Sequence, residues 1–211
     1  MKHFKLFHFR IIIPFILLCF LGFSSYSDSP SDFEYELTKI VRAFKANIMD
    51  EDECEDLKYE ADDLADDIED ALDDSDNYTR EEILKLKQLK KEAEALEEFI
   101  ACVGHVGNYI PTLEDFNLAN KRVRANVAIV SNNEFCIDVI VVNTGDYVAY
   151  LGKNSTDKNF TVSYEWKAVG ATSSGNGTMG LSKQSVRHIY DNRDKPNQSS
   201  IKVFNVTCKE F

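Results

Sequence analysis

Cysteine and histidine are the residues of this chain best suited to chemistry, and their spacing does not match a catalytic or metal-binding motif. The chain has five cysteines and four histidines in 211 residues. Neither CxxC nor CxxxxC occurs, so the spacing does not indicate a zinc site. The sequence also lacks Gly-x-Ser-x-Gly, HExxH and a phosphate-cradling glycine loop. We therefore predict no catalytic residue, no cofactor and no metal site, and a protein that is not an enzyme.

The first 27 residues have the three parts of a secretory signal peptide. A basic start ending at Arg10 precedes an apolar run from Ile11 to Phe23, and Ser25 and Ser27 form a small-x-small pattern. We expect cleavage after Ser27, with an uncleaved anchor as the alternative. The apolar run is shorter than the ~20 residues of a membrane span. We therefore expect a secreted protein without a membrane span after cleavage.

Two histidines remain after the signal, and we interpret both as structural. His105 follows a predicted helix and His188 lies in a predicted strand. Paired carboxylates are abundant in the chain, but on an open helix face nothing raises one pKa above the other.

The four cysteines that remain after the signal fall two and two across a change in composition. Secreted proteins favour disulfides, and four cysteines allow three connectivities. Cys54 and Cys102 lie in an acidic helical half, whereas Cys136 and Cys208 lie in a half patterned as strands. We predict the disulfides Cys54–Cys102 and Cys136–Cys208. The second pairing is inferred chiefly from membership of one domain.

Asparagine sequons are numerous, which is typical of a eukaryotic secretory route. Each has the form Asn-x-Ser/Thr with x other than Pro, the acceptor pattern for N-glycosylation. We predict glycans, which require exposed positions. The sequons are Asn77, Asn154, Asn159, Asn176, Asn197 and Asn205.

Residues 31–103 follow a helical repeat of apolar side chains. Two stripes, from Cys54 to Ala71 and from Leu86 to Val103, have the alternating spacing of three and four residues found in coiled coils. A turn at 73–78 separates them, and Thr79 with Glu82 has the pattern of a capping box. We predict an antiparallel helical hairpin preceded by a shorter helix around 32–48. Folding at Asn77 places Cys54 and Cys102 at nearly the same height, which is the basis for pairing them.

The helical half is strongly acidic. Residues 50–76 contain 16 Asp or Glu and a single basic residue, Lys58. We interpret this run as the solvated outer face of a helix. The alternatives are calcium binding, although the calcium-loop pattern fails because Ala61 stands at its twelfth place, and a docking surface for a basic partner. The acidity argues against nucleic acid as a partner.

From about Asn120 the pattern changes to the alternation of strands. Phe160–Ala168 alternates most regularly, and Phe135–Val142 is apolar on both faces, as in a central strand. Six or seven short strands without an intervening helix indicate an antiparallel sandwich. The other predicted strands are 123–129, 147–151, 178–181, 185–190 and 201–208. Turn residues separate them, including the run 173–177.

One segment resembles a known family. The run Ile140-Val141-Val142-Asn143-Thr144-Gly145-Asp146, followed by Gly180-Leu181-Ser182 before another strand, is similar to the cell-adhesion-related (CARDB-type) sandwiches. The later turn lacks the glycine of that family. The resemblance covers roughly residues 122–205 and implies an immunoglobulin-like module for extracellular adhesion, with no catalytic residues.

These features predict an α+β protein of two domains. A signal peptide (1–27) precedes an acidic helical domain (28–104), a linker (105–119) and an immunoglobulin-like β-sandwich (120–211). We expect a secreted, glycosylated binding or adhesion protein with an extracellular protein or glycan partner, and the helical half as a spacer or oligomerisation element. The alternative is a soluble carrier with an apolar cavity between helices and sheet. Its expected lining is Tyr109, Ile110, Phe116, Tyr164 and Trp166.

Overall fold

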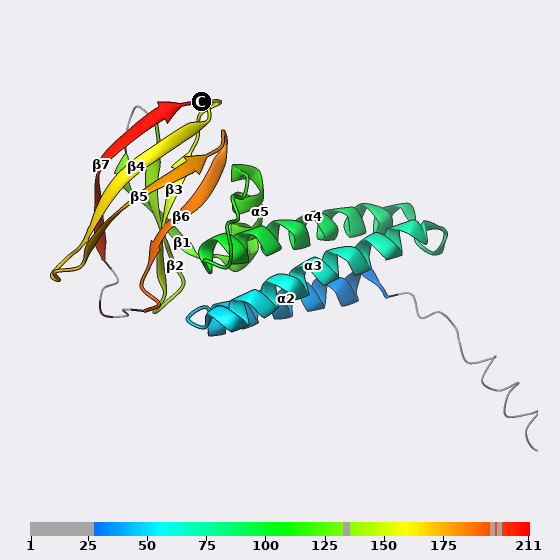
Figure 1. Ribbon diagram of the computed structural model, residues 1–211. Coiled ribbons are helices and arrows are strands. Elements are labelled where there is room, and N and C mark those ends of the chain that lie inside the picture. The colour runs from blue at the N-terminus through cyan, green and yellow to red at the C-terminus, as the bar shows by residue number, and fades with distance from the viewer. Residues whose placement is uncertain (1–27, 133–135, 195–196, 198–199) are drawn as a thin grey trace, which may run out of the picture.

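The protein is α+β, with its helices first in the chain and its strands second (Figure 1). The computed structural model describes residues 28–132, 136–194, 197 and 200–211, so the predicted signal peptide lies outside the described residues. The helices are α2 (Pro30–Asn47), α3 (Glu51–Asp73), α4 (Arg80–Val103) and α5 (Leu113–Val123). No helix in these described ranges is long and apolar enough to cross a membrane.

The predicted helical hairpin is confirmed as α3 and α4, preceded by α2. Local sequence determines where these helices begin, because side chains satisfy the free N–H groups of the first turn. Asp50 accepts from the backbone of Asp52 and Glu53 before α3. Thr79 and Glu82 form the predicted capping box before α4. The apolar stripes then face one another in a common core that includes Leu64, Ile68, Leu86 and Leu89.

Ion pairs between neighbouring helices partly offset the repulsion among the acidic side chains. Lys90 of α4 lies 3.1 Å from Glu69 of α3. Arg122 of α5 lies 2.6 Å from Glu34 of α2 and also pairs with Glu92 of α4. This guanidinium therefore links three helices through two carboxylates.

The strands form two antiparallel sheets that remain separate from each other. Sheet order is β1-β2-β3-β6 in one and β5-β4-β7 in the other. All seven predicted strands are present in the described residues. They are β1 (Asn126–Asn132), β2 (Asp138–Asn143), β3 (Val148–Asn154), β4 (Phe160–Ala168), β5 (Ser174–Leu181), β6 (Ser185–Asp191) and β7 (Ile201–Glu210).

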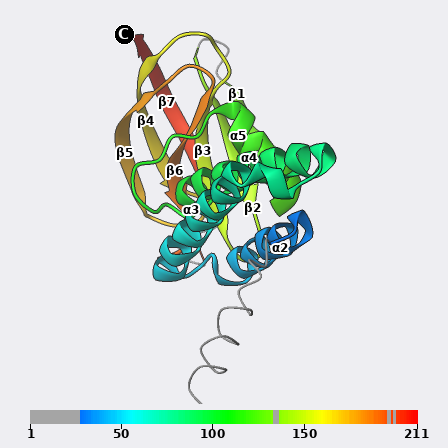
Figure 2. The same cartoon turned by 90° about the vertical axis from the view of Figure 1, so that its right-hand side faces the viewer.

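The four-stranded sheet lies between the helices and the three-stranded sheet, which explains why β2 is apolar on both faces. Ile140 and Leu151 join the core of the helices, whereas Val139 and Tyr150 pack towards the three-stranded sheet. The helices lie in front of the strands when the molecule is viewed from the helical side (Figure 2). Helices and sheet thus share one continuous hydrophobic core, although their compositions differ.

Helix α5 was not predicted. It spans the expected boundary between the linker and the strand half, and Val123, expected at the start of a strand, is its last residue. Its N-cap is Thr112, whose hydroxyl accepts from the backbone N–H of Asp115 at 3.1 Å. Phe116 packs α5 against the core, with its ring centroid 5.1 Å from that of Phe99. The apolar residues of the predicted linker are therefore partly those of a packed helix.

The predicted turn at 173–177 is wrong, because most of it belongs to β5. Gly175 and Gly177 pair with Trp166 and Tyr164 of β4. A Cβ atom on Gly175 would lie 2.8 Å from the Trp166 ring, and one on Gly177 would lie 2.5 Å from the Tyr164 hydroxyl. These glycines therefore make room for aromatic rings that lie across them, and do not reverse the chain.

Candidate functional site at the junction of helices and strands

The C-terminal end of α4 is held by polar side chains that come from the strand half. Carbonyl groups of a last helical turn have no partner within the helix. The Val103 carbonyl accepts from the Tyr147 hydroxyl at 2.6 Å. The Cys102 carbonyl faces Nδ1 of His188 at 3.2 Å. Burial raises the pKa of Tyr147, so its hydroxyl stays protonated and donates.

Arg193 caps two helix ends at once. Its guanidinium donates to the Gly104 carbonyl at 2.6 Å and to the Ile48 carbonyl at 3.1 Å. These are the C-cap residues of α4 and α2. Because α4 has no basic residue in its last turn, Arg193 supplies the positive charge that a helix C-terminus favours. The guanidinium also lies 5.5 Å from the centre of the Tyr147 ring.

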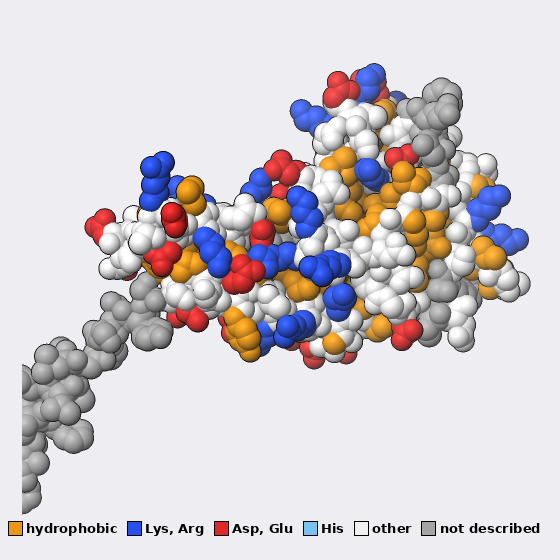
Figure 3. All heavy atoms as spheres, turned by 180° about the vertical axis from the view of Figure 1, so that it is seen from behind, with side chains coloured by type: hydrophobic (Ala, Val, Ile, Leu, Met, Phe, Trp, Pro, Cys, Tyr) orange, Lys and Arg blue, Asp and Glu red, His pale blue; other side chains and the backbone are white. Residues whose placement is uncertain are grey.

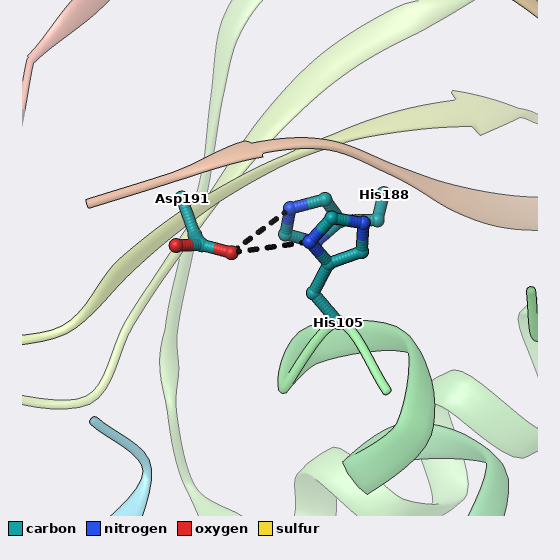
Figure 4. Close-up of side chains that lie close together, drawn as sticks. All are labelled: His105, His188 and Asp191. Atoms are coloured by element: carbon teal, nitrogen blue, oxygen red, sulfur yellow. Dashed lines mark ion pairs between the residues drawn. The ribbon is translucent and has the colours of Figure 1, made fainter. Parts of the chain in front are cut away.

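Beside this cap, His105, His188 and Asp191 form a cluster that we call the His–His–Asp cluster (Figure 4). His105 follows α4, whereas His188 and Asp191 belong to β6. The imidazole rings are stacked, with centroids 4.0 Å apart and planes inclined by 5°. Asp191 Oδ2 lies 3.5 Å from His105 Nδ1 and 3.3 Å from His188 Nε2.

The two histidines differ in burial, and burial decides the charge of His188. The His188 side chain is 8% exposed and that of His105 is 57% exposed. Burial lowers the pKa of His188, and the nearby imidazole of His105 adds to the effect. Burial by itself would raise the pKa of Asp191, but the hydrogen bond from His105 and the backbone N–H of Arg193 outweigh it and hold that pKa well below 3.8. Asp191 is therefore a carboxylate beside a neutral His188.

The His–His–Asp cluster opens into a cavity of about 270 Å³. The cavity is lined by the three cluster residues together with Trp166, Ile189, Tyr190 and Asp194. One potential ligand atom from each cluster residue lies within 4.8 Å of the others. A carboxylate with two imidazoles, reached from solvent on one side, can hold a cation or exchange a proton. This is the only cluster of three such groups among the described residues.

The predicted pairing of Cys136 with Cys208 agrees with the structure. Their Cα atoms are 6.1 Å apart and their sulfur atoms are within bonding distance. Cys136 precedes β2 and Cys208 lies on β7, so the disulfide joins the two sheets. This is a cross-link between layers, placed beside the buried cluster of Ile137, Phe160 and Val162.

The predicted Cys54–Cys102 disulfide is not formed, and both cysteines are free and buried. The hairpin does bring Cys54 close to the end of α4, as predicted, but it lies opposite Gly104 and not opposite Cys102. A Cβ atom on Gly104 would be 3.2 Å from Cys54 Sγ. Cys102 is two residues earlier and hence turned by about 200° around the helix axis. Burial raises the pKa of Cys54 to about 11 and that of Cys102 to about 12, so both are neutral thiols.

The six sequons differ in accessibility, and Asn154 requires a correction. Its side chain is fully buried, and its Nδ2, the atom that would carry a glycan, donates to the carbonyls of Lys158 and Ser182. The folded chain therefore has no room for a glycan at Asn154. Asn159 is half-buried. The exposed sequons are Asn77, Asn176, Asn197 and Asn205.

The five residues expected to line a carrier cavity are not gathered around one space. Phe116 belongs to the core shared by helices and sheet. Ile110 packs against the cluster at the disulfide, and Trp166 packs against a third cluster between the sheets. Tyr164 contacts both of these clusters, and the Tyr109 ring lies 4.9 Å from the Lys58 ammonium.

A second surface feature lies on β1 and α5, and we call it the β1–α5 face. Strand β1 is at the edge of its sheet, where Ile129 is 58% exposed and Val130 is 50% exposed. A hollow of about 220 Å³ lies beside them, lined by Leu113, Phe116, Asn117, Val127, Ile129, Ile140 and Lys153. Figure 3 shows hydrophobic side chains gathered over the middle of the strand half, with Lys and Arg side chains over the helices and at the rim of the strand half.

Sequence reasoning missed the His–His–Asp cluster because no local spacing reveals it. His105 and His188 are 83 residues apart, and each has a chain environment typical of a structural histidine. The pattern His188-x-x-Asp191 was the one local signal. What the structure defines is an α+β protein with a titratable cluster where its helices meet its strands. No known protein family, curated protein or solved structure matches the chain.

Proposed function

We propose that this protein is a secreted, N-glycosylated binding protein without catalytic activity, and that its β1–α5 face docks a protein partner. In this proposal the two sheets form an immunoglobulin-like sandwich. Export is supported by the signal-like start of the chain and by the Cys136–Cys208 disulfide, which an oxidising compartment maintains. Side-chain clusters between the sheets support the sandwich.

The observation that carries the proposal is the exposed apolar edge at β1. An edge strand presents unpaired N–H and C=O groups to which an extended segment of a partner can add as a further strand. Ile129 and Val130 would be covered by such a segment, and the adjoining hollow would take one of its side chains. The irregular register between Ile129 and Ser131 limits pairing of β1 with a second long strand, so a short segment fits best.

The distribution of sequons also supports the β1–α5 face as the binding surface. None of the six sequons lies on β1 or α5. By contrast, Asn176 and Asn205 lie on β5 and β7 of the three-stranded sheet, and Asn77 lies in the turn between α3 and α4. Glycans at these positions would cover the opposite sheet and the far end of the helices, and would leave the β1–α5 face open.

A binding experiment with a matched control tests this proposal. The full chain would be produced in a eukaryotic secretory cell, recovered from the medium and measured against a panel of purified extracellular proteins. Ile129→Lys places a charge at the proposed contact and is expected to weaken binding by about 10-fold or more, equivalent to ~1.4 kcal/mol. Val169→Lys is the control, because Val169 is 63% exposed and follows β4 in the other sheet. Retention in the cell, binding to no panel member, or equal loss in both variants would contradict the proposal.

A further inference from the structure

The Nε2 atom of His188 is a buried nitrogen that lies beside a carboxylate. The Cys102 carbonyl can only accept a hydrogen bond, so the contact at 3.2 Å requires the proton on Nδ1 of His188. Nε2 then carries the lone pair and has no hydrogen-bond partner. It lies 3.3 Å from Asp191 Oδ2, which is also an acceptor. A buried polar atom without a partner calls for an explanation, and a cation held between two acceptors supplies one.

A divalent metal ion fits between these two atoms, because an imidazole nitrogen and a carboxylate oxygen are both metal ligands. We propose that His105, His188 and Asp191 form a binding site for a divalent transition-metal ion, with Zn²⁺ as the best match. This site is separate from the β1–α5 face and does not depend on the function proposed for it.

The distances in the cluster agree with tetrahedral coordination. Zinc bonds to histidine nitrogen and carboxylate oxygen at about 2.0–2.2 Å, which places two ligands of a tetrahedron ~3.3–3.5 Å apart. The distances from Asp191 Oδ2 are 3.3 Å to His188 Nε2 and 3.5 Å to His105 Nδ1. Both distances match edges of such a site, and all three ligand atoms lie within 4.8 Å of one another.

Two of the three ligands are already oriented by hydrogen bonds from outside the cluster. Metal-binding histidines commonly donate their other N–H to a carbonyl, which fixes the tautomer and the ring. His188 does so towards the Cys102 carbonyl. Asp191 Oδ1 accepts from the backbone N–H of Arg193 at 2.8 Å, so Oδ2 is left for the ion. The strand β6 thus presents a prepared pair of ligands.

His105 is the adjustable ligand. Lone pairs of stacked, parallel imidazoles lie in parallel planes and do not converge on one point, so the His105 ring must turn out of the stack to bind. Its side chain is 57% exposed, so the ring has solvent on one side into which it can turn. The fourth position then faces the cavity beside Trp166 and Tyr190, where water or a group from a bound molecule completes the shell.

The donor set selects the class of metal. Two imidazoles and one carboxylate suit Zn²⁺ and its transition-metal neighbours, whereas Ca²⁺ and Mg²⁺ prefer shells of oxygen. The ion would also join the end of α4 to β6. Binding should therefore raise the stability of the whole folded chain, because the metal binds only when helix and strand are together.

The test is calorimetric titration of the chelator-treated mature chain with Zn²⁺, in excess Ca²⁺ and Mg²⁺ to occupy the acidic surface. We expect one saturable site and a rise in Tm. Outside the predicted signal the chain has only two histidines, so NMR of the imidazole protons gives an independent readout. Both sets of signals should shift, and His105 should leave the stack.

Variants decide whether binding occurs at the cluster. His105→Ala should weaken Zn²⁺ binding at least about 10-fold, since even residues that only hydrogen-bond a metal ligand contribute about 10- to 100-fold. Because His105 is exposed, we expect its replacement to leave the protein folded, so this variant stays informative even if His188→Ala does not fold. Asp66→Asn, on the exposed face of α3, is the control and should bind as the parent does. No saturable binding, or equal affinity in His105→Ala and the parent, would overturn the proposal and leave adventitious binding only.

Discussion

Replacement of Arg193 should destabilise the protein more than any other change of a single charged residue at the junction. Its side chain is 11% exposed and donates to the carbonyls of Gly104 at 2.6 Å and Ile48 at 3.1 Å. A hydrogen bond to a charged group contributes about 1.5–3 kcal/mol. Loss of two such bonds, partly offset by water that enters the space, predicts that Arg193→Ala lowers the free energy of unfolding by ~3–4 kcal/mol.

The measurement is urea unfolding followed by far-UV circular dichroism and by fluorescence of the single tryptophan, Trp166. Arg193→Met keeps the aliphatic stem and removes both hydrogen bonds, so it should lose nearly as much as Arg193→Ala. Arg193→Lys should lose an intermediate amount, because one ammonium group does not reproduce the planar fork of guanidinium. Lys202→Ala, at an exposed position of β7, is the control and should change stability by less than about 0.5 kcal/mol.

A small effect of Arg193→Ala, below about 1 kcal/mol, would mean that water satisfies both carbonyls equally well and would contradict this prediction. It would also be refuted if Arg193→Met were as stable as the parent, because packing of the stem would then be the whole contribution.

Three further predictions follow from burial and charge. Cys54, with a pKa of about 11, is only about 0.1% thiolate at pH 8. Cys54 and Cys102 should therefore resist iodoacetamide in the native protein and react with it in urea. Detection of both thiols in modified form in the folded chain, by mass spectrometry, would contradict this prediction. The hydrogen bond from Arg122 holds the pKa of Glu34 below 4.5, so its stabilising effect is present above pH 4.5 and is lost as pH falls through the folded-state pKa. Glu34→Gln should therefore reduce the slope of the free energy of unfolding against pH in the acid range. An unchanged slope would count against the ion pair. Glycopeptide mapping of the exported protein should find no glycan at Asn154, and an occupied Asn154 in folded material would show that its burial is wrong.

Most of the fold could be predicted because its signals are local. The apolar stripes at intervals of three and four residues defined α3 and α4, and the alternation in Phe160–Ala168 defined β4. Predictions failed where a distant packing partner overrides the local signal. Gly175 and Gly177 look like turn residues until the rings of Trp166 and Tyr164 are placed across them.

The candidate site was much less predictable, because its residues come from the two halves of the chain. His105 became part of a cluster only when the end of α4 met β6. The same contact explains the unpaired cysteines. The hairpin brought Cys54 near the end of α4, but the helical turn placed Gly104, and not Cys102, opposite it.

The sequence by itself determined the order of helices and strands, the acidic face of the hairpin and the grouping of Cys136 with Cys208, because periodicity, charge and composition are properties of short segments. Only the tertiary structure decided which groups lie at the junction. Arg193 caps two helices, and His188 presents an unpaired nitrogen to Asp191, because an end of the helical unit packs against β6. Such contacts depend on the distance and orientation between elements, and no spacing along a single chain encodes them.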